Sequence, residues 1–175
     1  PSLAAPWLMP TGLLTIVLGT MGLLAALTLR TSVSYLVVIS TGTLLAGIGL
    51  FTRDAIAAAL IYLVHSTLIS GGLFLLADLI ARQRGAAGDR FDRAQTVIQP
   101  ALIGAILFAG GAAIAGLPSM SGFLTKVMLL QAAMDSHWMV WLWAVVLSSG
   151  VLVLFSLSRS GSALFWRTGD APPIN

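Results

Sequence analysis

The property of this sequence that most restricts its fold is a series of long runs without a charged side chain. The uncharged runs cover residues 3–29, 33–52, 55–77, 97–125 and 138–158. A helix of about 20 apolar residues crosses the hydrocarbon core of a bilayer. Inside that core every backbone amide and carbonyl needs a protein partner, so only helices and closed barrels cross it. The runs lack the apolar–polar alternation of barrel strands, and they therefore predict membrane-spanning helices.

We expect an all-α, polytopic transmembrane bundle of five or six helices, with no strand. The predicted helices cover roughly residues 12–29, 33–51, 55–79, 97–116 and 138–158, with a sixth helical segment near 121–135. Residues 1–175 then form a single transmembrane domain. The chain begins at Pro1 without a basic segment and ends in a polar stretch at Asn175. We therefore expect no signal peptide and an internal piece of a longer protein.

The composition excludes several classes of function. Hydrophobic residues make up 58% of the chain and charged residues 9%, whereas a soluble domain carries about 25% charged residues. Nucleic-acid binding is not expected, because the basic residues are scattered over short loops and form no basic face. The absence of cysteine excludes disulfides and thiolate metal sites. The sequence also lacks the motifs of an enzyme active site, so we expect no catalysis, no metal and no cofactor.

Charged residues gather in one substantial loop. Residues 82–95 contain four arginines against Asp89 and Asp92. Basic loops resist translocation, so this loop is expected on the cytoplasmic side. Asp78 and Arg82 are four residues apart, a spacing that suits an ion pair at the end of a helix. Arg30 is interpreted as an interfacial arginine that caps the first span.

Lys126 is the only lysine of the chain and the only charged residue between positions 97 and 134. Placing an ammonium inside a bilayer costs several kcal/mol, so such residues often mark ion or proton pathways. An amine in a low-dielectric surrounding releases its proton more readily than in water, whereas an arginine would keep its charge. A lysine near a helix end can instead extend its head group to the interface, and the sequence leaves this alternative open.

The segment before Lys126 contains Gly116, Pro118 and Gly122. Proline has no amide hydrogen with which to continue a helix, and glycine relaxes the backbone. The segment therefore predicts either a break within one membrane helix or a turn between two spans. A break leaves backbone groups without helical partners at membrane depth, and such breaks are common at ion sites.

A polar face is expected on the third predicted helix. Tyr62, Ser66 and Ser70 recur every four residues, and His65 is adjacent to this face. Hydroxyl and imidazole groups can support a chain of waters, and histidine changes its protonation state near neutral pH. The alternative is a histidine that only forms a hydrogen bond to a neighbouring helix.

These residues resemble a known family. The stretch GLPSMSGFLTK, from Gly116 to Lys126, resembles the GLPPLSGFxxK stretch of antiporter-like subunits. Such subunits occur in Mrp-type Na⁺/H⁺ antiporters, respiratory NADH dehydrogenase and membrane-bound hydrogenases. The stretches YLVHSTL (62–68) and LFLLADLIAR (73–82) are similar to the D subunit of Mrp antiporters in particular. The resemblance implies a longer protein built from two inverted repeats, with this chain as most of the second repeat.

The resemblance also assigns roles to individual positions. The family lysine after "GF" corresponds to Lys126, and the lysine of a "DLKR" motif corresponds to Arg30, which does not readily deprotonate. In the "NHxxxK" stretch, Ser66 occupies the usual histidine position and Ser70 the usual lysine position, with His65 one place earlier. The implied proton path therefore consists of Lys126, His65, Arg30, Ser66 and Ser70.

The function implied by the resemblance is exchange of a monovalent cation, Na⁺ in the first instance, for protons. The chain would act as one subunit of a multi-subunit complex in the bacterial inner membrane, with the other subunits and the lipid bilayer as its partners. Two alternatives remain open from the sequence. One is a proton-pumping subunit of an NADH dehydrogenase or hydrogenase complex, and the other is a structural membrane scaffold.

Overall fold

The computed structural model describes residues 5–92, 97–118 and 120–165 of the chain. They form six α-helices: α1 (Ala5–Ala25), α2 (Leu29–Ile48), α3 (Arg53–Gln83), α4 (Pro100–Ala115), α5 (Ser121–Ala132) and α6 (Met139–Phe165). A short 3-10 turn, η1 (Gly85–Ala87), follows α3. Within these described ranges the only β-type pairing is an isolated bridge between Thr28 and Arg90. The predicted all-α fold is confirmed, including a helix break within residues 116–122.

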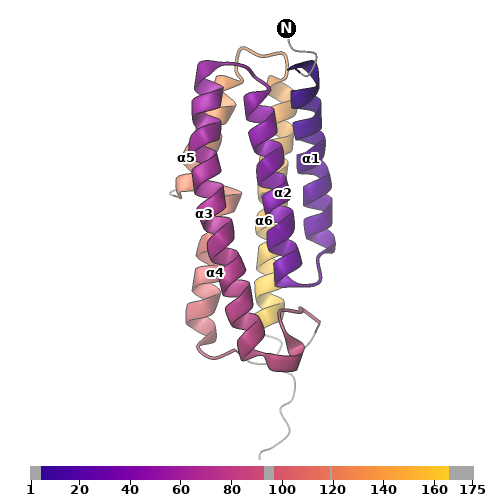
Figure 1. Cartoon of the computed structure of the whole chain (residues 1–175), viewed down its shortest axis with the longest axis vertical. Coiled ribbons are helices and arrows are strands. Elements are labelled where there is room, and N and C mark those ends of the chain that lie inside the picture. The colour runs from indigo at the N-terminus through magenta and orange to yellow at the C-terminus, as the bar shows by residue number, and fades with distance from the viewer. Residues whose placement is uncertain (1–4, 93–96, 119, 166–175) are drawn as a thin grey trace, which may run out of the picture.

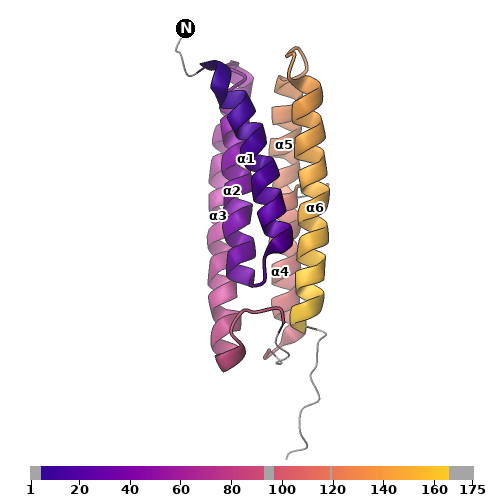
Figure 2. The ribbon, with the colours of Figure 1, turned by 90° about the vertical axis from the view of Figure 1, so that its right-hand side faces the viewer.

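The helices run along the long axis of the molecule in two layers. Helices α1, α2 and α3 form one layer, and α4, α5 and α6 form the other (Figures 1 and 2). The layers contact each other where α1 meets α6 and where α3 meets α4 and α5. Buried apolar side chains from both layers fill the core, among them Ile16, Leu36, Ala77, Ile114 and Val146. In lipid, close packing of this kind is a main source of helix association.

The lengths of the helices suit a membrane-spanning protein. Helices α1, α2, α3 and α6 are long and apolar enough to cross a membrane, by length and composition. α4 has 16 residues and α5 has 12, fewer than a full crossing requires. α4 and α5 follow one another along the long axis (Figures 1 and 2), as the two parts of an interrupted helix.

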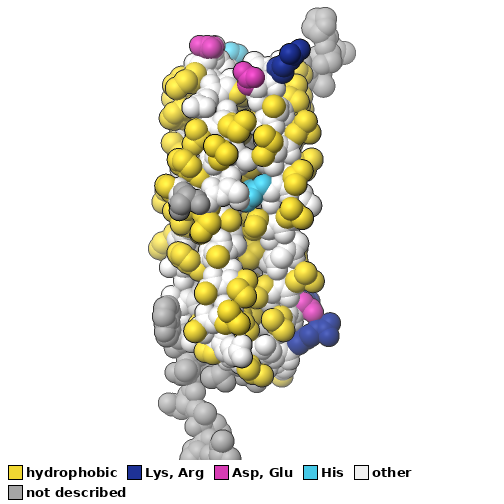
Figure 3. Space-filling model, turned by 90° about the vertical axis from the view of Figure 1, so that its left-hand side faces the viewer, with side chains coloured by type: hydrophobic (Ala, Val, Ile, Leu, Met, Phe, Trp, Pro, Cys, Tyr) yellow, Lys and Arg dark blue, Asp and Glu magenta, His cyan; other side chains and the backbone are white. Residues whose placement is uncertain are grey.

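The outer surface is also suited to lipid. Large apolar side chains are widely exposed, for example Leu68 at 70% and Leu75 at 75%. On the face that Figure 3 shows, charged side chains lie at the two ends of the molecule and hydrophobic side chains lie between them. A soluble protein does not expose apolar surface on this scale. The chain is therefore a multi-pass membrane protein.

The start of α2 differs from the sequence expectation. The hydroxyl of Thr28 accepts a hydrogen bond from the amide of Thr31 (3.1 Å), and the carboxylate of Asp89 accepts one from the amide of Arg30 (2.8 Å). Such acceptors satisfy the first amides of a helix, which have no partner inside it. The expectation that Arg30 caps the first span is therefore wrong. α1 ends at Ala25, and Arg30 lies in the first turn of α2.

A buried arginine organises the loop after α3. The side chain of Arg84 is fully buried, and its guanidinium donates to the carbonyls of Gly88 (2.8 Å) and Arg90 (2.9 Å). Burial lowers the pKa of Arg84 from its usual value, and the nearby charge of Asp89 opposes this shift. These bonds hold the loop in the position from which Asp89 reaches α2.

An ion-pair group lies at the same end of the bundle. Asp78 accepts hydrogen bonds from Arg82 and from Arg30, each at 2.7 Å. The predicted pair between Asp78 and Arg82 is thus confirmed, and Arg30 adds a link from α2 to α3. The side chains are partly or largely exposed, at 42% for Asp78 and 78% for Arg82. Exposed pairs of this kind typically contribute about 0–1 kcal/mol to stability.

Candidate functional site

The candidate site is built around the interruption between α4 and α5. α4 ends at Ala115, and Gly116 takes a left-handed conformation (φ 82°) that would strain a residue with a side chain. The amides of Gly116 and Leu117 both donate to the carbonyl of Ala112, each at 3.0 Å. In a continuing helix the amide of Leu117 would bond to Ala113. The carbonyl of Ala113 is therefore left without its helical partner.

Two side chains from other helices bond to the last turn of α4. Nζ of Lys126, on α5, donates to the carbonyl of Ala115 at 2.8 Å. Nε2 of His65, on α3, lies 3.2 Å from the carbonyl of Ala113. Carbonyls in the last turn of a helix lack intrahelical donors and attract positive charge. The break thus creates two acceptors, and the two side chains singled out from the sequence occupy them.

The position of Lys126 depends on glycines. A Cβ atom at Gly116 would lie 2.8 Å from Cδ of Lys126. A Cβ atom at Gly150, on α6, would lie 3.2 Å from the carbonyl oxygen of Ala115 and 4.0 Å from Nζ of Lys126. The lysine therefore extends between the end of α4 and α6, in space that side chains at these positions would restrict. An ammonium and a neutral amine both donate hydrogen bonds, so this contact is compatible with either protonation state.

His65 is held from both sides of its ring. Its Nδ1 lies 3.0 Å from the hydroxyl of Ser121, the first residue of α5. A Cβ atom at Gly122 would overlap the carbonyl oxygen of Ala113 and would lie 2.9 Å from Nε2 of His65. His65 consequently contacts both halves of the interrupted helix, and the start of α5 approaches the end of α4 closely because residue 122 is glycine.

The remaining polar side chains of α3 face the interior. Ser66 and Ser70 are buried, at 4% and 6% exposure. The hydroxyl of Ser66 donates to the carbonyl of Leu63 on its own helix (3.2 Å). The hydroxyl of Tyr62 donates to Ser40 on α2 (3.2 Å). The polar face predicted for this helix therefore points into the bundle, while His65 lies at its edge and is half-buried.

The structure does not bring Arg30 to this site. Arg30 lies at the end of the bundle, paired with Asp78, whereas His65 and Lys126 bond to separate carbonyls in the last turn of α4. Sequence reasoning missed the contacts of Ser121 and Gly150. Ser121 lies inside the motif that revealed the break, so its position was a usable signal. Gly150 is one small residue within an apolar span, and nothing in the sequence pointed to its contact.

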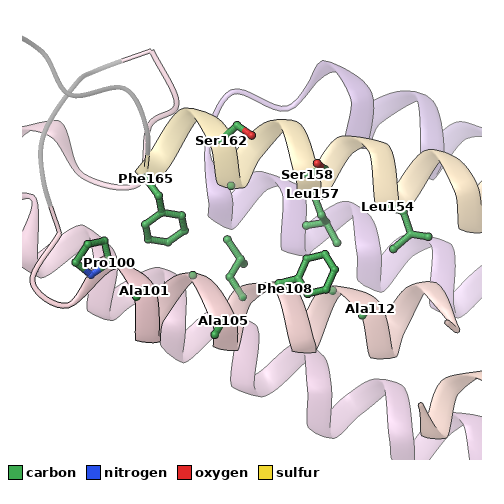
Figure 4. Close-up of a pocket in the computed structure, with 14 residues that line it drawn as sticks. Pro100, Ala101, Ala105, Phe108, Ala112, Leu154, Leu157, Ser158, Ser162 and Phe165 are labelled. Atoms are coloured by element: carbon green, nitrogen blue, oxygen red, sulfur yellow. The ribbon is translucent and has the colours of Figure 1, made fainter. Parts of the chain in front are cut away.

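A separate groove lies between α4 and α6. It has a volume of about 640 Å³ and is lined mainly by small and aromatic residues, including Gly104, Phe108, Gly111 and Phe165. Figure 4 shows Phe108 and Phe165 facing the side chains of the opposite helix, with the hydroxyls of Ser158 and Ser162 nearby. No charged side chain lines the groove among the residues described.

Most of the sequence matches a known family, and the chain is similar to known proteins. A family described as NADH:quinone oxidoreductase/Mrp antiporter, TM, matches residues 2–152. The chain is 32% identical over 198 residues to the D subunit of a probable K⁺/H⁺ antiporter of Rhizobium meliloti, covering 96% of this chain and 37% of that protein. It is 29% identical over 154 residues to the D subunit of a Na⁺/H⁺ antiporter of Alkalihalophilus pseudofirmus, covering 87% of this chain and 31% of that protein.

The fold is likewise similar to that of a solved structure. A chain of the Mrp complex from Dietzia sp. DQ12-45-1b superposes with a TM-score of 0.86 at 24% identity, over 99% of this chain and 32% of that chain. At this level of identity the likeness concerns the fold alone. The chain spans about a third of the length of the proteins that it matches.

Proposed function

The chain belongs to the NADH:quinone oxidoreductase/Mrp antiporter transmembrane family, and on that premise we propose that it serves in a subunit of an Mrp-type complex that exchanges a monovalent cation for protons. Both relatives described above are named as the D subunit of a cation/proton antiporter, one for K⁺ and one for Na⁺. To identify the cation carried here, exchange activity is therefore to be measured with both ions, Na⁺ first.

The observation that carries the proposal is the placement of Lys126. It is the only lysine of the chain, and its Nζ bonds to the Ala115 carbonyl at the helix break. Transport of protons needs a group that gains and loses a proton inside the membrane, and an amine in a low-dielectric site can do so. The hydrogen bond to Ala115 persists for the neutral amine, so the side chain keeps its position through a protonation cycle.

The proposed proton path extends from Lys126 to other polar side chains. His65 bonds to the same helix end, where its proposed part is to hold the break in place, and Ser66 and Ser70 lie on the interior of α3. Arg30 lies at the end of the bundle, so its proposed part is electrostatic, through its pair with Asp78. Waters between these groups would complete the connection.

Variants of Lys126 test the proposal in the intact complex. Cation-dependent proton exchange is measured in everted vesicles with Na⁺ and with K⁺. Lys126→Ala is expected to lower exchange by on the order of 100-fold, the effect of losing a group that transfers protons. Lys126→Arg should also impair exchange, because a guanidinium holds its proton. Arg53→Ala, which removes a positive charge at an end of the bundle away from the break, serves as the control and should remain active.

Three outcomes would contradict the proposal in different ways. Full activity of Lys126→Arg, with loss of exchange in Lys126→Ala, would mean that the lysine supplies a positive charge and does not transfer protons. Normal exchange in every variant would favour a structural scaffold. Proton movement that occurs only during electron transfer, without dependence on Na⁺ or K⁺, would favour a redox-driven proton pump.

A further inference from the structure

Both ring nitrogens of His65 have a partner, and the two partners differ in chemistry. Nε2 lies 3.2 Å from the carbonyl oxygen of Ala113. A carbonyl oxygen only accepts hydrogen bonds, so Nε2 must carry a hydrogen. Nδ1 lies 3.0 Å from the hydroxyl of Ser121, which can donate or accept. In a neutral ring with hydrogen on Nε2, the lone pair on Nδ1 accepts from Ser121. The geometry therefore specifies one tautomer.

We propose that His65 is a positioning residue, which in its neutral Nε2–H tautomer holds the two halves of the interrupted helix against α3, with the Ala113 carbonyl setting that tautomer and the Ser121 hydroxyl donating to Nδ1. The inference rests on the proposed function, because the element that it positions carries Lys126. Through Ala113 the imidazole bonds to the end of α4, and through Ser121 it bonds to the start of α5.

The described contacts of the His65 ring are all with uncharged groups. The described groups that contact it are a carbonyl, a hydroxyl and the tilted ring of Tyr62, whose centroid is 6.3 Å away. No carboxylate lies among these described contacts to stabilise an imidazolium. Lys126 already places a positive charge at the same helix end when protonated. A second cation in this low-dielectric region would be costly.

Gly122 makes the arrangement possible. A side chain at this position would collide with the Ala113 carbonyl and approach Nε2 of His65 to 2.9 Å. The glycine lets the first turn of α5 lie against the last turn of α4, with the imidazole bonded to both. Since Lys126 is one helical turn after Gly122 on α5, displacement of the start of α5 would also displace the lysine from Ala115.

Substitution by glutamine separates positioning from proton transfer. A glutamine amide donates from nitrogen and accepts at oxygen, as the Nε2–H tautomer does, but it does not titrate. In the intact complex, His65→Gln is expected to retain exchange within about twofold of wild type. His65→Ala is expected to lose at least about tenfold, since small misplacements of reacting groups have effects of this size. His137→Gln, in the loop before α6, is the matched control and should match wild type.

If His65→Gln is as inactive as His65→Ala while wild type exchanges ions, the positioning role is wrong and a proton-transfer role is favoured. Equal activity of His65→Ala and wild type would also contradict it. If wild type itself shows no cation-dependent exchange, the proposed function fails, and the positioning role is then tested by spectroscopy alone.

Nitrogen-15 NMR of the histidine-labelled complex supplies that independent test. The resonances of His65 are identified as those that are missing from the spectrum of the His65→Gln complex. At neutral pH one protonated and one unprotonated ring nitrogen are expected, with the hydrogen on Nε2. Ser121→Ala removes the donor to Nδ1 but leaves the Ala113 carbonyl, so the hydrogen should stay on Nε2 while the Nδ1 resonance shifts toward that of an imidazole nitrogen without a hydrogen-bond donor. A hydrogen on Nδ1 alone, two protonated nitrogens, or a spectrum unaffected by Ser121→Ala would overturn the proposal.

Discussion

At the scale of single residues, the glycines of the candidate site differ in what surrounds them. Gly116 and Gly122 lie where helices α4 and α5 meet, and a Cβ atom at either would contact a neighbouring atom too closely. Gly71 and Gly72 have open space instead, with nothing within 4 Å of a Cβ atom. The sequence places Gly116 and Gly122 at the predicted break, but only the neighbours in space show what a side chain would contact at each of the four positions.

Substitution of Gly122 tests this difference. Gly122→Ala should destabilise the complex by about 1–3 kcal/mol, the typical cost of forcing extra volume into a packed site. Gly72→Ala adds the same methyl group in open space and replaces glycine by a better helix former, so it should be neutral or stabilising. The measurement is the midpoint of thermal unfolding of the purified complex, followed by tryptophan fluorescence. Equal midpoints for Gly122→Ala and wild type would refute the packing account.

At the scale of secondary structure, α2 shows how a helix end depends on a distant segment. Thr28 caps the helix locally, but Asp89, 59 residues after Arg30, accepts the hydrogen bond from the Arg30 amide. A negative charge near a helix N-terminus is favourable. The loop that carries Asp89 is in turn held by Arg84 and by the backbone bond from Leu29 to the Asp89 carbonyl (3.0 Å).

Removal of the distant cap should loosen the first turn of α2. Asp89→Ala is expected to cost about 1 kcal/mol, the usual value for a helix cap, and to speed amide exchange at residues 29–32 by roughly fivefold, since 1 kcal/mol corresponds to that factor. Hydrogen–deuterium exchange with mass spectrometry measures this change. Asp135→Ala, at the opposite end of the bundle, should leave these amides unchanged. A similar effect from both variants would mean that Asp89 has no specific role as a cap.

At the scale of the whole molecule, the two ends of the bundle differ in charge. Five arginines of the described residues lie at or near one end: Arg30, Arg82, Arg84, Arg90 and Arg159. The opposite end carries Arg53 together with Asp54 and Asp135. Short loops rich in arginine stay on the cytoplasmic side during insertion. The arginine-rich end is therefore proposed to face the cytoplasm.

Cysteine labelling tests this orientation. The chain has no native cysteine, so single substitutions within it are unambiguous once cysteines elsewhere in the complex are removed. Ala86→Cys, in the loop after α3, should react with a membrane-impermeant maleimide only in everted vesicles. His137→Cys, at the other end, should react only in right-side-out vesicles. The reverse pattern would show that the arginine-rich end faces away from the cytoplasm.

Much of the architecture could be predicted from the sequence, because the bilayer imposes simple requirements. Uncharged runs of sufficient length must be helices, and Pro118 cannot continue one. These two facts indicated the number of helices and the position of the break. The limits of the helices were less accurate, as at α2, because caps such as Asp89 come from distant parts of the chain.

The sequence predicted two side chains of the candidate site but not the groups that they contact, and the difference has a physical reason. The cost of an isolated charge or imidazole in lipid is a property of the residue and its run, so Lys126 and His65 could be identified from the sequence by itself. The hydrogen-bond partners of these two side chains could not be identified from the sequence, because every residue carries the same backbone carbonyl. Only the tertiary structure shows that the carbonyl of Ala113 loses its helical partner, and that α3 and α5 bring His65 and Lys126 to the carbonyls of Ala113 and Ala115.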